Sequence, residues 1–407
     1  MSGLPPILKL HNRYRQTGGE EAVVAAEYAL LASAGHDVSL REMDNADIAG
    51  LSGSMASFAA ASGSEKSGAW LERLLDETGA GIVHVHNFFP LLSPTIHLTA
   101  ARRGVAVVQT LHNYRLLCAA ATFLRDGEVC EKCVSGGRKW ALIHRCYRGS
   151  LAGSLASIRM QRATIGSRQW LNGVHRFIAL SEFARQKMIA GGLPAERVVV
   201  KGNFLESAPV PPETPMDKGT GRTGVIYVGR LSAEKGLREL IEAWRALPDI
   251  ALAIIGTGPL EAELKAGAPP NVRFAGYCSA EEVASKMRCA SLLVMPSLWY
   301  EGFPRTMVEA FARKLPVIAS DLGSLREIAG EGRLARLVEP GNIDALSGAV
   351  RQLMGSDDER GRLAEAAHGA YLQHHTAEIN LGKLEDIYRA ALGEVAQAPA
   401  TGLGSRS

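Results

Sequence analysis

The sequence lacks the features that would place it inside a membrane or on nucleic acid. It contains no run of about 18 uninterrupted apolar residues, the length that a membrane-spanning helix needs. Its first ten residues show no basic region followed by a long apolar core, so we expect no secretory signal. The chain also has no large excess of one sign of charge, since it contains 45 Lys and Arg and 42 Asp and Glu. A net charge of +3 gives no reason to expect nucleic-acid binding. We expect a cytoplasmic protein.

Cysteine is scarce, and one common nucleotide motif is missing. Six cysteines without a secretory signal indicate a reducing compartment, where thiols bind metal or stay free. No G-x-G-x-x-G spacing follows the first predicted strand, so nicotinamide binding is not indicated. What is present is an ordinary globular composition, with 46% hydrophobic and 21% charged residues. A chain of 407 residues is too long for a single core, so two domains are expected.

Short apolar segments alternate with helical patterns along most of the chain, which predicts an α/β fold with parallel sheets. The clearest predicted strands are 7–12, 81–86, 105–111, 225–228, 252–255, 272–276 and 292–295. We divide the chain into a Rossmann-like domain at 1–205, a linker at 206–224 and a second Rossmann-like domain at 225–374. The first domain includes a cysteine-containing segment at 114–150. A last helical run at 375–397 has no strand partner.

One stretch, 297–310, follows a predicted buried strand and runs into a predicted helix. Pro304 suits the first helical turn, and Gly302 lets the backbone come close to a ligand. The N–H groups of Arg305 and Thr306 would then form an anion site at the helix N-terminus. The alternative is an ordinary helix N-terminus with acidic residues near it that bind no ligand.

Two carboxylates frame the same stretch. Because Gly302 and Pro304 interrupt the helix, Glu301 lies in the loop and Glu309 one turn inside the helix. Both can then flank one pocket. Carboxylates beside a phosphate site are suited to accept hydrogen bonds from neutral hydroxyls such as those of sugars and ribose. The pattern predicts a sugar-nucleotide pocket.

Two cations follow the first strand of the second domain, in the segment 229–236. Arg230 and Lys235 at the carboxyl end of a parallel sheet would neutralise a diphosphate without a metal ion. Surface salt bridges are the alternative for both. The next two strands end at Gly256-Thr-Gly258-Pro259 and at Gly276-Tyr277. We expect contacts near Tyr277 to select the nucleotide base.

The first domain opens with a strand, a loop ending in Gly18-Gly19 and a helix, which is a favoured place for a phosphate. Glu20 and Glu21 could equally serve only to stabilise that helix N-terminus. His112 follows a strand at the carboxyl edge of the sheet and is a candidate for the pocket. His84 and His86 lie two apart on one strand. Without a third ligand nearby, we interpret them as structural histidines.

Four cysteines occur in the pattern C-x11-C-x2-C-x12-C: Cys118, Cys130, Cys133 and Cys146. This is a spacing from which four thiolates can reach one zinc ion, so a structural zinc is predicted. Four free thiols or a redox pair are the alternatives. The same segment interleaves basic and aromatic residues, including Arg138, Lys139 and Trp140. Such a surface suits an anionic bilayer at the inner face of the cytoplasmic membrane, with a solvated basic face as the alternative.

Together these residues resemble a retaining GT-B glycosyltransferase of family 4. The resemblance rests on Gly18-Gly19, His112, the 229–236 segment, Gly256-x-Gly258-Pro259 and the Trp299-Tyr-Glu-Gly-Phe303-Pro304 stretch with Glu301 and Glu309. It implies two Rossmann-like domains that face each other across a cleft, the first binding the acceptor and the second the donor. It also implies that the last helix crosses back onto the first domain.

The resemblance implies roles for single residues. Arg230 and Lys235 would hold the donor diphosphate, and Glu309 the ribose. Glu301 would bind hydroxyls of the donor sugar, with His112 close to that sugar. Gly19 would let the first domain close onto the phosphates.

The implied activity is transfer of a hexosyl-type sugar from a nucleoside diphosphate to a polyprenyl-diphosphate-linked or saccharide acceptor. The anomeric configuration would be retained, no cofactor would be required, and the setting would be bacterial surface polysaccharide synthesis. Two alternatives remain at this point. They are a sugar-nucleotide epimerase of the same architecture and a non-catalytic module that binds nucleotide sugars.

Overall fold

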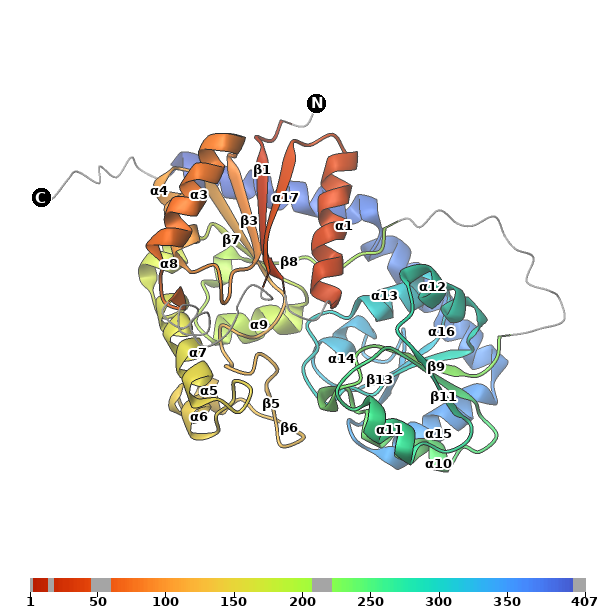
Figure 1. Cartoon of the computed structure of the whole chain (residues 1–407). Coiled ribbons are helices and arrows are strands. Elements are labelled where there is room, and N and C mark those ends of the chain that lie inside the picture. Colours follow the sequence, from red (N-terminus) through yellow and green to blue (C-terminus); the bar gives the residue numbers. More distant parts are fainter. Residues whose placement is uncertain (1–2, 14–17, 45–59, 207–221, 398–407) are drawn as a thin grey trace, which may run out of the picture.

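The computed structural model describes residues 3–13, 18–44, 60–206 and 222–397, and within them two parallel six-stranded sheets dominate (Figure 1). Most of the predicted linker at 206–224 lies outside these described residues. No helix in the described ranges combines the length and apolar character that crossing a membrane would require.

The first sheet has the strand order β2-β1-β3-β4-β7-β8. Its strands are β1 (Ile7–Arg13), β2 (Val38–Asp44), β3 (Ile82–Asn87), β4 (Ala106–Leu111), β7 (Arg176–Ala179) and β8 (Val198–Val200). Every residue of β3 and β4 is buried, as expected for central strands of a parallel sheet with both faces covered. The main helices around it are α1 (Gly19–Ser33), α3 (Glu65–Thr78), α4 (Thr95–Arg102), α8 (Arg168–Gly173) and α9 (Glu182–Ala190).

The second sheet has the order β11-β10-β9-β12-β13-β14. Its strands are β9 (Val225–Val228), β10 (Leu252–Ile255), β11 (Val272–Gly276), β12 (Leu292–Met295), β13 (Val317–Ser320) and β14 (Arg336–Val338). The accompanying helices are α10 (Leu237–Arg245), α11 (Glu261–Gly267), α12 (Ala280–Cys289), α13 (Arg305–Ala312), α14 (Ser324–Ile328), α15 (Ile343–Met354) and α16 (Asp357–His374). The predicted fold of two doubly wound α/β units is confirmed.

An insertion between β4 and β7 carries the four spaced cysteines. It consists of the hairpin β5 (Leu124–Arg125) and β6 (Glu128–Val129), followed by α5 (Lys132–Ser135), α6 (Lys139–Ile143) and α7 (Leu151–Ala163). Ser150 is the N-cap of helix α7: its side chain accepts a hydrogen bond from the backbone N–H of Gly153. Figure 1 shows this insertion projecting from the carboxyl edge of the first sheet.

Helix α17 (Ala377–Gln397) covers the first sheet although it follows the second sheet in sequence. Four of its residues recur at the spacing of one helical face and are fully or nearly buried: Leu384, Ile387, Tyr388 and Ala391. They share one apolar cluster with Ile82 and Val108 of the first sheet. Figure 1 shows this blue helix lying behind the red and orange strands. The expected return of the last helix to the first domain is confirmed.

Candidate functional site

The site in the second domain follows from the order of its strands. β9 and β12 are hydrogen-bonded neighbours, although two strands separate them in sequence. After β9 the chain continues to β10 on one side of this strand pair, and after β12 it continues to β13 on the other side. In open parallel sheets this is the point where ligands bind, outside the carboxyl ends of the strands. The loop 229–236, which follows β9, therefore lies beside the loop 296–304, which follows β12.

Side chains join these two loops directly. The Lys235 ammonium donates to Oε1 of Glu301 at 2.7 Å, and the Ser297 hydroxyl donates to the same oxygen at 2.6 Å. The Lys235 ammonium also lies 5.2 Å from the centre of the Trp299 ring. Glu301 is only 4% exposed, so the contact with the Lys235 ammonium offsets part of the cost of burying the carboxylate. The structure thus brings Lys235 and Glu301 into contact. That the two line one donor pocket stays a prediction.

The backbones of the two loops are also packed tightly. A Cβ on Gly236 would lie 1.9 Å from the carbonyl oxygen of Pro296, and the φ of Gly236 is +69°. Both facts require glycine. The backbone N–H of Leu298 donates to the carbonyl of Glu234 at 2.9 Å. These contacts hold Lys235 and Glu301 in a fixed relation.

Arg230 and Lys235 already have acidic partners. Arg230 pairs with Glu234 at 3.2 Å, while about half of the Arg230 side chain remains exposed. The surface salt bridge considered for Arg230 is therefore present. An ammonium has three N–H donors and Glu301 takes one from Lys235, so Lys235 retains donors for an anion.

Helix α13 starts at Arg305, with Pro304 as its N-cap rather than in its first turn. The Pro304 φ of −70° still suits the entry to a helix, so the prediction was displaced by one position. Glu309 lies on the next turn, and its carboxylate is 3.6 Å from Nε of Arg305. Its partner is thus on its own helix, while the partner of Glu301 is on the neighbouring loop.

The loop after β12 is also where the two domains meet. A Cβ on Gly302 would lie 2.6 Å from the carbonyl oxygen of His112. The carbonyl of Phe303 accepts a hydrogen bond from the Asn203 side chain at 2.7 Å. The space that we had expected Gly302 to leave for a ligand is thus used by the first domain. The same contact brings the backbone of His112 against the site.

Sequence reasoning missed further contacts between the domains. The Glu327 carboxylate accepts the backbone N–H groups of Glu182 and Phe183, at 2.8 and 2.7 Å, at the N-terminus of α9. The Tyr300 hydroxyl donates to Glu131 of the cysteine-containing insertion at 2.9 Å. No local sequence pattern predicts such pairs, because each joins residues that are far apart in the sequence.

On the first domain, α1 begins at Gly19 with Gly18 as its N-cap. The Glu21 carboxylate accepts the N–H of Gly18 at 2.8 Å, so the helix-stabilising role considered for this acid is present. A Cβ on Gly19 would meet no atom of the described residues within 4 Å. The fold therefore does not itself explain glycine at position 19. Residues 14–17, the rest of this predicted loop, lie outside the described part.

Tyr277 directly follows β11 and is 82% exposed. It is one of the few large hydrophobic side chains in the described residues that lie mostly in solvent. Its ring stands at the carboxyl end of the second sheet, on the edge formed by β11.

The four spaced cysteines all have free thiols; Cys118 is buried and the other three are half-buried. Burial, followed by the neighbouring Cys118, Cys146 and Cys130, raises the pKa of Cys133 to about 11. Cys133 and Cys146 pack against one small apolar cluster. In the described ranges, however, the one group of three or more candidate ligand atoms within 4.8 Å of each other is Glu27, His84 and His86. The structural zinc stays a prediction.

His84 fits the structural role that we assigned to it. Its ring nitrogens contact the hydroxyls of Tyr388 and Thr110, each at 2.8 Å. The premise that no third ligand lies near His84 and His86 is wrong, because Glu27 is close to both. A signal existed in the sequence, since Glu27 stands on the apolar face of α1, four residues from both Val23 and Leu31.

Each half of the chain matches a described protein family. Residues 18–203 match the family model described as "Glycosyl transferase 4-like domain". Residues 216–369 match the model described as "Glycosyl transferases group 1". The two matches correspond to the two sheets.

Curated relatives agree with these matches. The chain is 25% identical over 335 residues to alpha-D-kanosaminyltransferase of Streptomyces kanamyceticus, covering 78% of this chain and 79% of the relative. It is 32% identical over 210 residues to phosphatidyl-myo-inositol mannosyltransferase of Mycobacterium leprae, covering 49% of this chain and 55% of the relative.

Solved structures show the same fold. A glycosyltransferase from Rickettsia africae superposes with a TM-score of 0.66 at 16% identity, covering 97% of this chain and all of that one. Anabaena HepE, solved in complex with UDP and glucose, gives a TM-score of 0.64 at 17% identity, covering 94% of this chain and 99% of its own.

The Gly302 contact gives a first testable prediction. Gly302→Ala places a methyl group against the His112 carbonyl, which must move, so we expect the interface to lose about 1–3 kcal/mol. Denaturant unfolding measures the loss, and small-angle scattering should show a more open particle. Gly267→Ala, where a Cβ meets nothing within 4 Å, is the control. Equal stability and equal particle size for both variants would show that the close approach is unimportant.

Proposed function

The chain carries the two domains of a GT-B glycosyltransferase, and we propose that it transfers a hexosyl-type sugar from a nucleoside diphosphate donor to an acceptor hydroxyl. The observation that carries the proposal is the contact between Lys235 and Glu301 at the strand-order reversal of the second sheet. It sets a cation that can hold phosphate next to a carboxylate that can accept sugar hydroxyls.

The donor spans the loops after β9 and β12. Its diphosphate lies against Lys235 and Arg230, with the amide groups at the start of α13 as further donors. Glu309 accepts the ribose hydroxyls, and Tyr277 lies beside the base. Glu301 uses Oε1 for Lys235 and Ser297, which leaves Oε2 as its acceptor for the sugar.

The first domain completes the pocket around the donor sugar. His112 lies near that sugar because its backbone already contacts the Gly302 loop. Among the described residues, none lies within 4 Å of a Cβ built on Gly19, which suits a backbone that must approach the donor phosphates closely.

The reaction proceeds with retention at the anomeric carbon. The acceptor hydroxyl attacks from the face that the diphosphate leaves, and a leaving-phosphate oxygen takes the hydroxyl proton. Negative charge builds on the diphosphate as the glycosidic bond to it breaks. Arg230 and Lys235 stabilise that charge from fixed positions, so no divalent cation is required.

The acceptor is lipid-linked or a saccharide, in bacterial surface polysaccharide synthesis. A lipid acceptor is supported by the mycobacterial relative, whose name gives a phosphatidylinositol acceptor. It is also supported by the surface of the insertion. There Ile143, Leu151 and Leu155 are 61%, 55% and 40% exposed, among the basic residues that α6 and α7 present.

The donor site can be tested by single substitutions. We expect Lys235→Ala and Glu309→Ala each to lower the rate of transfer by about 100-fold or more, because each removes a contact to the donor. Lys265→Ala removes an exposed Lys–Glu pair of the same domain and is the matched control. Circular dichroism checks that the variants fold.

Two outcomes would overturn the assignment. Full transfer in both site variants would show that the donor binds elsewhere. An altered free sugar nucleotide, formed without consumption of acceptor, would favour an epimerase.

The membrane surface is tested separately. Reversing two charges of the insertion, Arg138→Glu with Lys139→Glu, should release the protein from sedimenting phosphatidylglycerol vesicles, because each basic residue contributes about 1 kcal/mol of attraction. Lys286→Glu with Arg288→Glu makes the same charge change on α12 of the second domain and should leave binding intact. Unchanged sedimentation of the first variant would contradict bilayer docking through the insertion.

A further inference from the structure

A buried charge cluster lies in the first domain, behind His112. The Glu27 carboxylate on α1 pairs with Lys9 of β1 at 2.7 Å and with Lys201, just after β8, at 2.6 Å. All three side chains are at most 1% exposed. Burial alone would raise the pKa of Glu27, but Lys201 and Lys9 outweigh it and hold the pKa well below its usual range. Glu27 is therefore an ionised carboxylate inside the protein.

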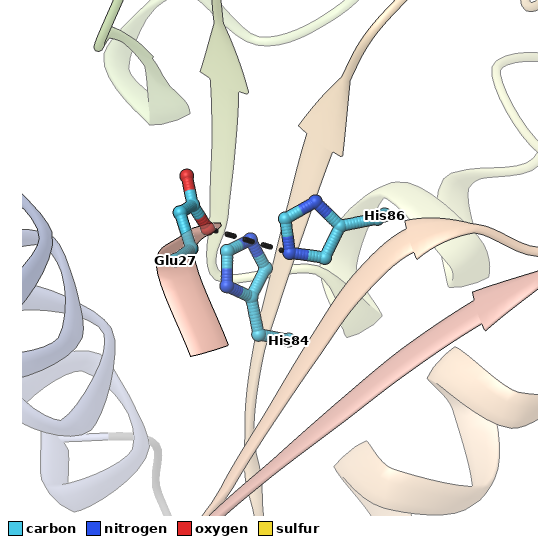
Figure 2. A group of neighbouring side chains, drawn as sticks. All are labelled: Glu27, His84 and His86. Atoms are coloured by element: carbon cyan, nitrogen blue, oxygen red, sulfur yellow. Dashed lines mark ion pairs between the residues drawn. The ribbon is translucent and has the colours of Figure 1, made fainter. Parts of the chain in front are cut away.

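The cluster has the residue types of a metal site, but the ligand atoms of Glu27 and His84 already have hydrogen-bond partners. Figure 2 shows Glu27 facing His84 and His86. Both carboxylate oxygens of Glu27 already accept from lysine ammonium groups, and both ring nitrogens of His84 contact hydroxyls. A divalent cation would have to displace these partners next to two positive charges. The contacts favour a hydrogen-bonded network.

A line of polar contacts leads from this cluster to His112. Nε2 of His86 lies 3.4 Å from Oε2 of Glu27, the pair joined by the dashed line in Figure 2. Nδ1 of His86 lies 2.9 Å from Nε2 of His112. Within the described residues, Nε2 of His86 forms no hydrogen bond, so its 3.4 Å approach to the Glu27 carboxylate is an electrostatic contact.

Both histidines of this line are neutral. Burial is the main cause that lowers the pKa of His112 to about 3, and burial also lowers the pKa of His86 well below its usual range. A neutral imidazole carries one N–H and one lone pair. A lone pair on Nε2 of His86 would face the Glu27 carboxylate and be repelled, so the proton of His86 sits on Nε2. Its Nδ1 is then an acceptor, and Nε2 of His112 must donate to it.

We propose that Glu27 and His86 are positioning residues that fix the tautomer of His112, with the proton on Nε2 and the lone pair on Nδ1. This inference rests on the proposed function, in which His112 lies beside the donor sugar. A fixed lone pair on Nδ1 makes His112 a hydrogen-bond acceptor for a hydroxyl of that sugar. Glu27 and His86 do not touch the sugar; they decide which of its groups His112 can recognise.

This line of contacts from Glu27 through His86 to His112, the relay, also explains why a charge is buried here. Glu27 repels a lone pair on Nε2 of His86 most strongly while its carboxylate is ionised, and a carboxylate without partners would take up a proton in this environment. Lys9 and Lys201 keep Glu27 ionised. Asn380 of α17 accepts a hydrogen bond from Lys201 at 3.1 Å, so the returning helix helps to hold the cluster.

Nitrogen-15 spectra of the full-length, histidine-labelled protein test the tautomer without any substrate. We expect both His86 and His112 to appear as neutral rings protonated at Nε2, with no titration between pH 5 and 8. A His112 ring protonated at Nδ1 in the native protein would overturn the relay. His175→Asn, which can keep the acceptor that His175 offers to the Val107 N–H, is the control and should leave the His112 signal unchanged.

Variants separate a relay from simple packing. His86→Leu removes the acceptor, so His112 should shift towards the Nδ1–H form, and kcat/KM for the donor should fall about ten-fold, the effect of one lost hydrogen bond. His86→Gln restores an acceptor oxygen and should restore the Nε2–H form in part. If His86→Leu keeps the native tautomer of His112, the relay is wrong.

The result is distinguishable from failure of the proposed function. A correct tautomer in a protein that turns over no nucleotide sugar would reject the proposed function and leave the relay standing. Normal transfer with the opposite tautomer would reject the relay alone. Glu27→Gln gives a further check where it folds. Its amide can donate to Nε2 of His86, which should reverse both tautomers.

Discussion

The parallel pairing of β9 with β12 is the constraint on which the site depends. These strands are distant in sequence, yet Val225 lies opposite Leu292 in one sheet. Their following loops must then emerge together at the carboxyl edge, which sets Lys235 against Glu301. Gly236 allows this by leaving room for the carbonyl of Pro296. Sheet topology and one glycine thus place a partly buried cation–carboxylate pair at the carboxyl edge of the sheet, where we propose that the donor binds.

The first domain contributes a second, independent framework. Its own charge cluster is buried within the first domain and is linked through His86 to His112. The two frameworks meet where the His112 carbonyl contacts Gly302. Helix α17 ties them further, because it continues from the second domain and packs on the first sheet. A change in the angle between the domains would therefore act on both sides of the pocket at once.

Much of this arrangement could be predicted from the sequence. The strands 225–228, 252–255, 272–276 and 292–295 were placed to the residue, because short apolar segments between turn residues leave little choice. That the segment 229–236 and the stretch around Glu301 share one edge of the sheet followed from the rule that ligand-binding loops gather at the carboxyl ends of the strands. The direct contact of Lys235 with Glu301 was not predicted. The ion-pair and packing partners of the site residues could not be predicted from the sequence. The Arg230–Glu234 pair and the use of Gly302 by His112 depend on side-chain and domain placement that no local pattern encodes.

The most direct test is a crystal structure of the full chain with a non-hydrolysable nucleoside diphosphate sugar. The account predicts diphosphate oxygens within hydrogen-bonding distance of the Lys235 ammonium and the Arg230 guanidinium. The sugar should lie between Glu301 and His112, and the ribose should lie at Glu309. A nucleotide bound away from the loops after β9 and β12 would contradict it.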